Sequence, residues 1–263
     1  MRPLRVMGPA EAARLRGLLF DLDDTFLDHG RLTLPAYEAL VRLASTGLRL
    51  GIITGRPAGF GHVLLRQWPI DFAVTENGGI TFVDEQGRPR RSDRFEPAER
   101  QHHRQRLASI AEEIARRFDL WPSEDNDLRL GDFSLDIGEF VRPSLDSVRA
   151  AEQFARAQGV YTVRSSIHLH LSLSAEDKAS GAVRVLHEVF GEDPSATLGR
   201  YAFIGDSEND AACFAAFHTT IGVANLSGRP TVVPAYVTES PRALGFAEAA
   251  DTLIRLRAST QST

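Results

Sequence analysis

The stretch that decides the fold is GLLFDLDDT, residues 17–25. Its first four residues are apolar and predict a buried strand, and acids follow where that strand ends. Residues two apart in an extended chain point the same way, so Asp21 and Asp23 can face one site. Two such carboxylates repel in a water-poor cleft, and Mg²⁺ relieves that repulsion by taking oxygen ligands. One carboxylate can then attack phosphorus while the other handles protons. A solvated acidic turn or a helix N-cap is the alternative that these residues leave open.

Outward from this stretch, short apolar runs alternate with helical patterns. Near the start of the chain, the strands are expected at 48–53, 72–75 and 80–83, with helices at 35–46 and 57–68. Toward the end, the helices are expected at 178–190, 208–216 and 243–257, with strands at 201–204 and 219–223. This alternation predicts an α/β fold with a Rossmann-like parallel sheet, built from both ends of the chain.

The middle of the chain has a different pattern. A polar, arginine-rich run is followed by a long helix at 98–118, one or two strands within 128–137 and a helix at 144–158. Residues 160–164 and 167–173 alternate like an exposed antiparallel hairpin. We therefore expect an inserted α+β cap domain at 84–175 and a catalytic core at 17–83 and 176–263. Residues 1–16 are expected to form a poorly ordered or loosely docked N-terminal extension.

Three more polar clusters follow strands or begin helices of the α/β part. Residues 53–56 read ITGR, where a hydroxyl and backbone N–H groups can hold phosphate oxygens, or Thr54 can simply cap a helix. Lys178 can offset the charge of nearby acids, or it can be a solvated surface group. In the run IGDSEND, residues 204–210, Asp206 can ligate a metal, and the alternative is an acidic first helical turn. Four unrelated caps explain the joint occurrence of these clusters poorly, because ligands of such sheets bind beyond the carboxyl ends of the strands.

The four clusters resemble motifs one to four of the haloacid dehalogenase superfamily of phosphohydrolases. The long insert resembles the type IIB cap of that superfamily, as in sugar-phosphate, mannosyl-3-phosphoglycerate and Cof-like phosphatases. The segment TENGG, residues 75–79, is similar to the one that leads into such caps. The resemblance covers 17–83 and 176–257, whereas only the architecture of the cap is similar. It implies a hydrolase that acts on phosphoric monoester bonds.

The resemblance also implies a role for individual residues. Asp21 would form an aspartyl-phosphate, Asp23 would be the general acid and base, and Lys178 would stabilise nucleophile and phosphate. The residues expected to hold Mg²⁺ are Asp21, Asp23 through its backbone carbonyl, Asp206 and Asp210. The residues expected to bind phosphate or substrate in the core are Thr54, Gly55, Arg56, Asn77 and Asn209.

Substrate choice is expected to lie with the cap, because the core handles only the phosphoryl group. Arg164, beside Ser165 and Ser166 at the apparent hairpin turn, is expected to bind substrate, since arginine suits carboxylate or phosphate recognition. The other cap candidates are Arg142, Ser166, His168 and His170, and for the two histidines a plain surface position is favoured. By analogy, the leading substrate class is a sugar or glycosyl phosphate.

Composition limits the partners of the protein. A net charge of −5 argues against a nucleic-acid binder that relies on bulk positive charge. No apolar run approaches the ~20 residues of a membrane span. The single cysteine excludes an intrachain disulfide and fits a reducing cytoplasm. We therefore expect a cytoplasmic monomer or homodimer that acts on a small phosphorylated molecule, without nucleic-acid or membrane partners. The alternatives are a sugar phosphomutase and a non-catalytic module that binds a phosphorylated ligand.

Overall fold

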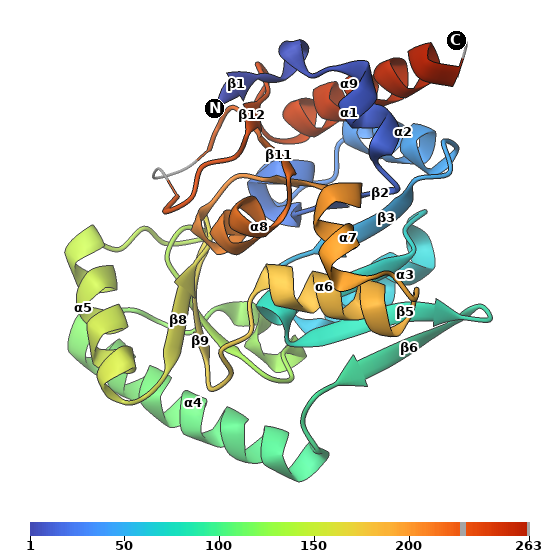
Figure 1. The fold of residues 1–263 in the computed structure, drawn as a ribbon. Helices are drawn as coiled ribbons and strands as arrows, with labels where there is room; N and C mark the ends of the chain where they lie inside the picture. The colour runs from blue at the N-terminus through green and yellow to red at the C-terminus, as the bar shows by residue number, and fades with distance from the viewer. Residues whose placement is uncertain (227–229, 262–263) are drawn as a thin grey trace.

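A nine-stranded sheet forms the centre of the molecule (Figure 1). The computed structural model describes residues 1–226 and 230–261. Within them the strand order of this sheet is β1-β12-β11-β10-β2-β3-β4-β5-β6. Its middle strands are β10 (Tyr201–Gly205), β2 (Gly17–Phe20), β3 (Arg49–Ile53) and β4 (Phe72–Thr75). These four neighbours pair in parallel, so their carboxyl ends lie side by side. The predicted α/β fold is confirmed.

Helices cover both faces of the sheet because its buried strands alternate apolar side chains between two cores. Leu18 and Ile52 belong to the core on one face, and Leu19 and Ile53 to the core on the other. The first face packs against α1 (Pro9–Arg14), α2 (Leu34–Ala44), α3 (Ala58–Gln67) and α9 (Arg242–Gln261). The second face packs against α6 (Lys178–Glu188), α7 (Pro194–Arg200) and α8 (Ala211–Ala216). The sheet is thus the middle layer of three.

The N-terminal segment is docked, which corrects the expectation for residues 1–16. Strand β1 (Arg2–Pro3) pairs in parallel with β12 (Tyr236–Val237), which continues the sheet beyond β11 (Thr219–Gly222). Leu4, Met7 and Leu15 are buried in the first core. Leu4 lies in a short 3-10 helix, whereas Met7 and Leu15 are extended residues that follow short helices, so no single helical period marks them in the sequence.

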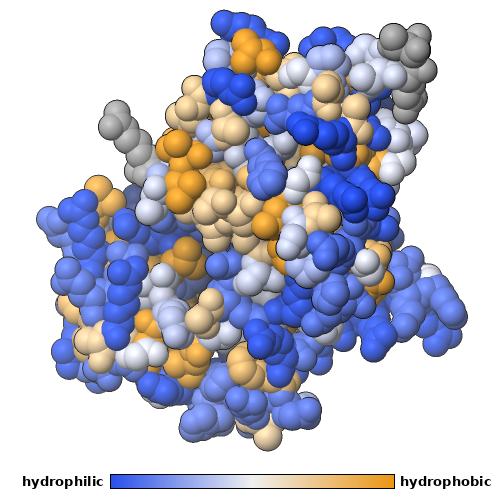
Figure 2. Space-filling model, viewed as in Figure 1, coloured by the Kyte–Doolittle hydropathy of each residue, from blue (hydrophilic) through white to orange (hydrophobic). Residues whose placement is uncertain are grey.

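The other edge of the sheet is an antiparallel hairpin of β5 (Ile80–Glu85) and β6 (Arg88–Asp93). The boundary expected at residue 84 therefore falls inside a strand, and residues 84–93 extend the main sheet. An edge strand needs main-chain pairing but no apolar side chains, and charges on it discourage pairing with another chain. Figure 2 shows this hairpin as a hydrophilic surface, whereas apolar residues gather around α8. Among the described residues, no helix has the length and hydropathy needed to cross a membrane.

A second, smaller unit lies across the carboxyl ends of the main strands. Its antiparallel sheet has the order β7 (Phe133–Asp136), β9 (His168–Ser172) and β8 (Tyr161–Arg164), and α4 (Pro97–Phe118) and α5 (Leu145–Ala157) cover one face. Leu107, Leu135 and Leu169 lie in its separate apolar core. We propose that residues 97–173 are the cap domain, and call them the cap below.

Candidate active site

The predicted polar clusters meet at one edge of the main sheet. Asp21 follows β2, Thr54 follows β3 and Asp206 follows β10. The amide of Asp21 donates to the carbonyl of Ile204 (2.9 Å), and that of Thr54 donates to the carbonyl of Val74 (2.8 Å). These bonds prolong the ladder by one residue beyond each strand. The chain therefore brings residues 21 and 54 to the same edge of the sheet.

Lys178 lies between two acids in the interior. Its Nζ donates to Asp21 Oδ1 (2.7 Å) and to Asp210 Oδ1 (2.6 Å), and the side chain is fully buried. The start of α6 holds it there, because Asp177 and Ser180 form a capping box across the first helical turn. A buried lysine is tolerated only when opposite charges surround it.

The charges at this centre change one another's affinity for protons. Burial raises the pKa of Asp21 to about 7; the nearby Lys178 opposes this rise, and Asp210 adds to it. Burial lowers the pKa of Lys178, but Asp21 and Asp210 outweigh burial and hold that pKa above its usual value. The centre holds more negative than positive charge, which favours a further cation.

Three carboxylates can supply that cation with ligands. Asp21, Asp206 and Asp210 each offer an oxygen, and these atoms lie within 4.8 Å of one another. Asp210 also fixes the turn after β10, because its Oδ2 accepts from the amides of Asp206 (2.8 Å) and Ser207 (3.0 Å). Burial raises the pKa of Asp206 well above its usual range, and Asp210 and Asp21 add to the rise. Hard oxygen donors in this number fit Mg²⁺.

The carboxylate of Asp23 lies outside this cluster. Its two oxygens accept from Arg56 Nε and Nη2, both at 2.8 Å, in a bidentate ion pair. Arg56 also donates to Glu139 of the cap (2.7 Å). Arg56 was expected to bind phosphate, but its side chain is paired with Asp23 and with Glu139 of the cap. The segments that follow the adjacent strands β2 and β3 meet here, which brings Arg56 to Asp23. The metal-binding role expected for the Asp23 carbonyl stays a prediction.

Asn77 and Asn209 are brought together beside this edge. Asn209 Nδ2 donates to Asn77 Oδ1 (3.1 Å), and the Asn77 amide donates to the Thr54 carbonyl (3.1 Å). The chain turns here with positive φ, which is 52° at Asn77 and 113° at Gly78. A Cβ on Gly78 would stand 2.2 Å from the Asp177 carbonyl, so only glycine lets the turn approach α6 this closely.

Glu76 ties the core to the cap and was not among the predicted site residues. Its Oε1 accepts from the amides of Ala58 (3.0 Å) and Leu130 (2.8 Å), and its Oε2 from those of Gly131 (2.6 Å) and Asp132 (3.0 Å). Burial raises the pKa of Glu76 to about 7, and Asp132 adds to the rise. The polar residues after β4 were a signal for this contact, but the cap partners of Glu76 are 54 or more positions away in the sequence.

His168 and His170 are buried, which corrects the surface position favoured for them. His168 Nε2 contacts Glu139 Oε2 (2.8 Å), and His170 Nδ1 contacts Asp132 Oδ2 (3.1 Å). The alternation of β9 is as predicted, but its polar face lies against the core instead of solvent. Arg129, also in the cap, donates to both oxygens of Asp132 (3.0 Å each) and completes this buried layer.

Arg164 is not brought to the site. Its Nε contacts Glu152 of α5 (3.0 Å), and it pairs in register with Leu169, whose side chain lies in the cap core. A strand residue on that face points toward the helices of the cap. Arg142 and Ser166 instead line a cavity of about 420 Å³ that Asp23 and Asp206 also line.

The comparisons with known proteins agree with this geometry. The family model of haloacid dehalogenase-like hydrolases matches residues 18–116. A phosphoglycolate phosphatase of Natronomonas pharaonis is 29% identical over 182 residues, which are 68% of this chain and 71% of the relative. A phosphoglycolate phosphatase of Haloarcula marismortui is 27% identical over 239 residues, which are 88% of this chain and 94% of the relative.

Solved structures share the fold over nearly the whole chain. A Thermoplasma acidophilum protein superposes with a TM-score of 0.73 at 20% identity, covering 92% of this chain and 99% of that one. A sugar phosphatase of subclass IIB of the haloacid dehalogenase superfamily superposes with a TM-score of 0.61 at 15% identity, covering 93% and 99%. Residues 18–116 thus match the model of haloacid dehalogenase-like hydrolases, and the chain shares the fold of these solved structures over nearly its whole length.

Proposed function

We propose that the chain is a magnesium-dependent phosphatase of a small phosphorylated metabolite, a sugar or glycosyl phosphate, that works through an aspartyl-phosphate on Asp21. The observation that carries this proposal is the position of Asp21. Its carboxylate lies at the end of a central strand, 2.7 Å from the buried Lys178 and within reach of Asp206 and Asp210. A carboxylate so placed has a cation beside it to neutralise the charge that accumulates when phosphate approaches.

The substrate class is supported by the fold and by the relatives. The fold is shared with a subclass IIB sugar phosphatase, and the curated relatives are named phosphoglycolate phosphatases. Sugar phosphates and phosphoglycolate are both small organic phosphates. The cavity of about 420 Å³ beside Asp23 has room for a molecule of that size.

The first chemical step forms a bond between an Asp21 oxygen and phosphorus and breaks the bond from phosphorus to the ester oxygen. Asp23 gives a proton to the departing oxygen. Water then attacks the phosphorus of the aspartyl-phosphate, Asp23 takes a proton from that water, and phosphate leaves as the Asp21 carboxylate is restored. Thr54 and the Gly55 amide are placed to hold phosphate oxygens at the end of β3. Bound Mg²⁺, held by Asp21, Asp206 and Asp210, would supply electrostatic stabilisation of the phosphoryl group.

Asp23 cannot serve as an acid while both its oxygens accept from Arg56. One oxygen must be released, and Glu139 of the cap competes for the same guanidinium. A movement of the cap that shifts Glu139 therefore changes the hold of Arg56 on Asp23. We propose that cap closure over substrate and the readiness of Asp23 are linked through this arginine.

The experiment is a measurement of phosphate release from a panel of hexose phosphates, pentose phosphates, glycerol 3-phosphate and phosphoglycolate, with and without MgCl₂. Wild-type protein should release phosphate only with the metal, and Asp21→Asn should release none. The absence of turnover on every ester would contradict the enzyme proposal and leave a binding module. An isomerised sugar phosphate without free phosphate would instead identify a mutase.

A further inference from the structure

Two buried nitrogen atoms beside Gly55 have no hydrogen-bond partner among residues 1–226 and 230–261. They are His170 Nε2, from the cap, and Asn77 Nδ2, from the core. The side chains are only 2% and 6% exposed. A Cβ on Gly55 would stand 2.8 Å from His170 Nε2 and 3.2 Å from Asn77 Nδ2. Both atoms therefore pack against Gly55 and lie near one another. Buried polar atoms without partners are costly, so a ligand that pairs with them is favoured there.

The orientation of the Asn77 amide follows from a chain of hydrogen bonds. Ser207 Oγ accepts from the Asp210 amide in a capping box, so its hydroxyl proton is free to donate to Asn209 Oδ1 (2.8 Å). Asn209 must then present its NH₂ group, which donates to Asn77 Oδ1 (3.1 Å). The NH₂ group of Asn77 is left without a partner among the described residues and lies against Gly55. Asn77 therefore offers a donor there.

The tautomer of His170 follows from its partner on the other ring nitrogen. Asp132 accepts from Arg129 with both oxygens (3.0 Å each), so it acts as a carboxylate and accepts from His170 Nδ1–H (3.1 Å). Burial lowers the pKa of His170 well below its usual value, and Arg129 lowers it further, so the ring is neutral. His170 Nε2 therefore carries a lone pair and offers an acceptor.

One chemical group satisfies a donor and an acceptor at once. A hydroxyl accepts from Asn77 Nδ2 and donates to His170 Nε2, whereas an ionised phosphate or carboxylate oxygen can only accept. We propose that His170 and Asn77 together bind a hydroxyl group of the substrate's leaving group. This inference rests on the proposed function and deepens it, because it assigns the residues that select a hydroxylated phosphate ester over phosphoglycolate, which carries no hydroxyl.

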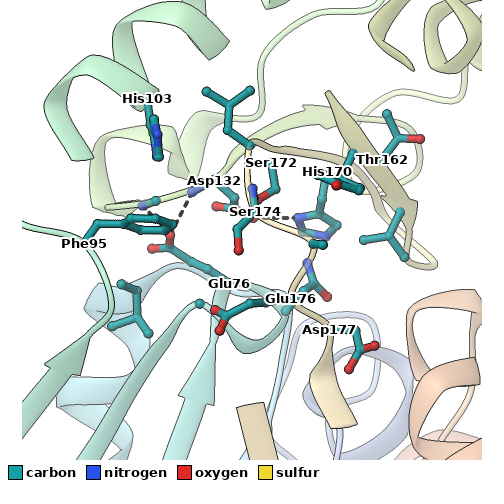
Figure 3. A pocket seen from close by; sticks show the side chains of 18 residues that line it. Glu76, Phe95, His103, Asp132, Thr162, His170, Ser172, Ser174, Glu176 and Asp177 are labelled. Carbon is teal, nitrogen blue, oxygen red and sulfur yellow. Dashed lines mark hydrogen bonds and ion pairs between the residues drawn. The ribbon is translucent and has the colours of Figure 1, made fainter. Parts of the chain in front are cut away.

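The surroundings provide room for such a group. His170 and Asn77 line a cavity of about 210 Å³ between cap and core, which Asp177 also lines. Asp177 directly precedes Lys178, the partner of the proposed nucleophile. Figure 3 shows His170 directed into this cavity from β9, with Asp132 beside it on the cap side. The donor, Asn77, belongs to the core, and the acceptor, His170, belongs to the cap. The two groups therefore meet only when the cap is docked on the core.

The test compares esters that differ only in hydroxyl groups. Glycerol 3-phosphate is paired with propyl phosphate, and glucose 6-phosphate with (tetrahydropyran-2-yl)methyl phosphate. In at least one pair, wild-type kcat/KM should be about tenfold or more higher for the hydroxylated ester. The ester without hydroxyl groups leaves the two buried nitrogen atoms unpaired. A ratio near one in both pairs overturns the inference without any variant. Loss of turnover on all four esters would instead overturn the proposed function.

The variants test which residue is responsible. His170→Leu should bring the preferred pair's ratio to near one, and His170→Gln should restore part of the preference. His168→Leu is the matched control, since His168 lies two residues away on the same face but its Nε2 is already paired with Glu139. That control should change both esters of a pair by the same factor. An unchanged ratio in folded His170→Leu would overturn the assignment.

Discussion

The acidic centre at the ends of β2 and β10 and the charged layer between core and cap are both buried, but they are held in different ways. In the centre, Lys178 donates to two core acids, Asp21 and Asp210. In the layer, Arg56 of the core is shared with Glu139 of the cap, and Glu76 accepts from three cap amides. The contacts of the proposed nucleophile are therefore made within the core. The contacts of the layer join the core to the cap.

The largest effect is expected from the centre. Asp21→Asn should lower kcat by about 10³-fold or more, because it removes the nucleophile. The fold should survive, since Lys178 keeps Asp210 as a partner. Phosphate release and thermal unfolding are the measurements, and Asp119→Asn, at an exposed cap position, is the control. Substantial turnover by Asp21→Asn would place the nucleophile elsewhere.

A second test of the centre removes the positive charge of Lys178. Lys178→Met leaves Asp21 and Asp210 buried without their shared partner, and breaking such a pair should cost about 3–5 kcal/mol in the free energy of unfolding. If the centre is a metal site, MgCl₂ should restore more stability to this variant than to the wild type, because the ion replaces the lost charge. Urea unfolding with and without MgCl₂ measures both effects. Equal gains in the two proteins would contradict the metal site.

A substitution in the charged layer should lower activity less than Asp21→Asn does. Arg56→Lys cannot hold Asp23 and Glu139 through one guanidinium, so the release of Asp23 is no longer linked to the cap, and kcat should fall by about ten- to a hundredfold. The loss should appear on every substrate, because Asp23 acts on the ester oxygen itself. Arg94→Lys is the control, since Arg94 is paired with Glu176 at an exposed position. A rise in KM alone would assign Arg56 to substrate binding.

Glu76 offers a pH test of the same layer. Its pKa in the folded protein, about 7, is above the usual 4.5. The folded state therefore binds this proton more tightly than the unfolded state does. The resulting stabilisation is complete below pH 4.5 and is lost as the pH rises through 7. Relative to Glu76→Gln, the wild type should lose about 2 kcal/mol of unfolding free energy between pH 5 and pH 8. Parallel stability curves for the two proteins would show that Glu76 does not titrate in this range.

The two regions also differ in how far the sequence predicts them. Asp21, Thr54 and Asp206 each follow an apolar strand, and parallel topology alone brings such residues together. The partners of Arg56 and Glu76 depend on how the cap sits, which local periodicity does not encode. His168 and His170 show the limit clearly. Alternation placed them on the polar face of β9, but only the docked cap shows that this face is buried against the core.

The smallest effect is expected at Arg164, the cap residue favoured by the sequence. Arg164→Ala removes a half-exposed ion pair with Glu152, which is worth no more than about 1 kcal/mol, and should leave kcat/KM nearly unchanged. Arg142→Ala is the matched variant, because Arg142 lines the 420 Å³ cavity, and it should raise KM severalfold. Steady-state kinetics of both variants on one substrate decide between them. A larger loss for Arg164 would require the cap to turn its helix-covered face toward the substrate, which the register of β8 with β9 opposes.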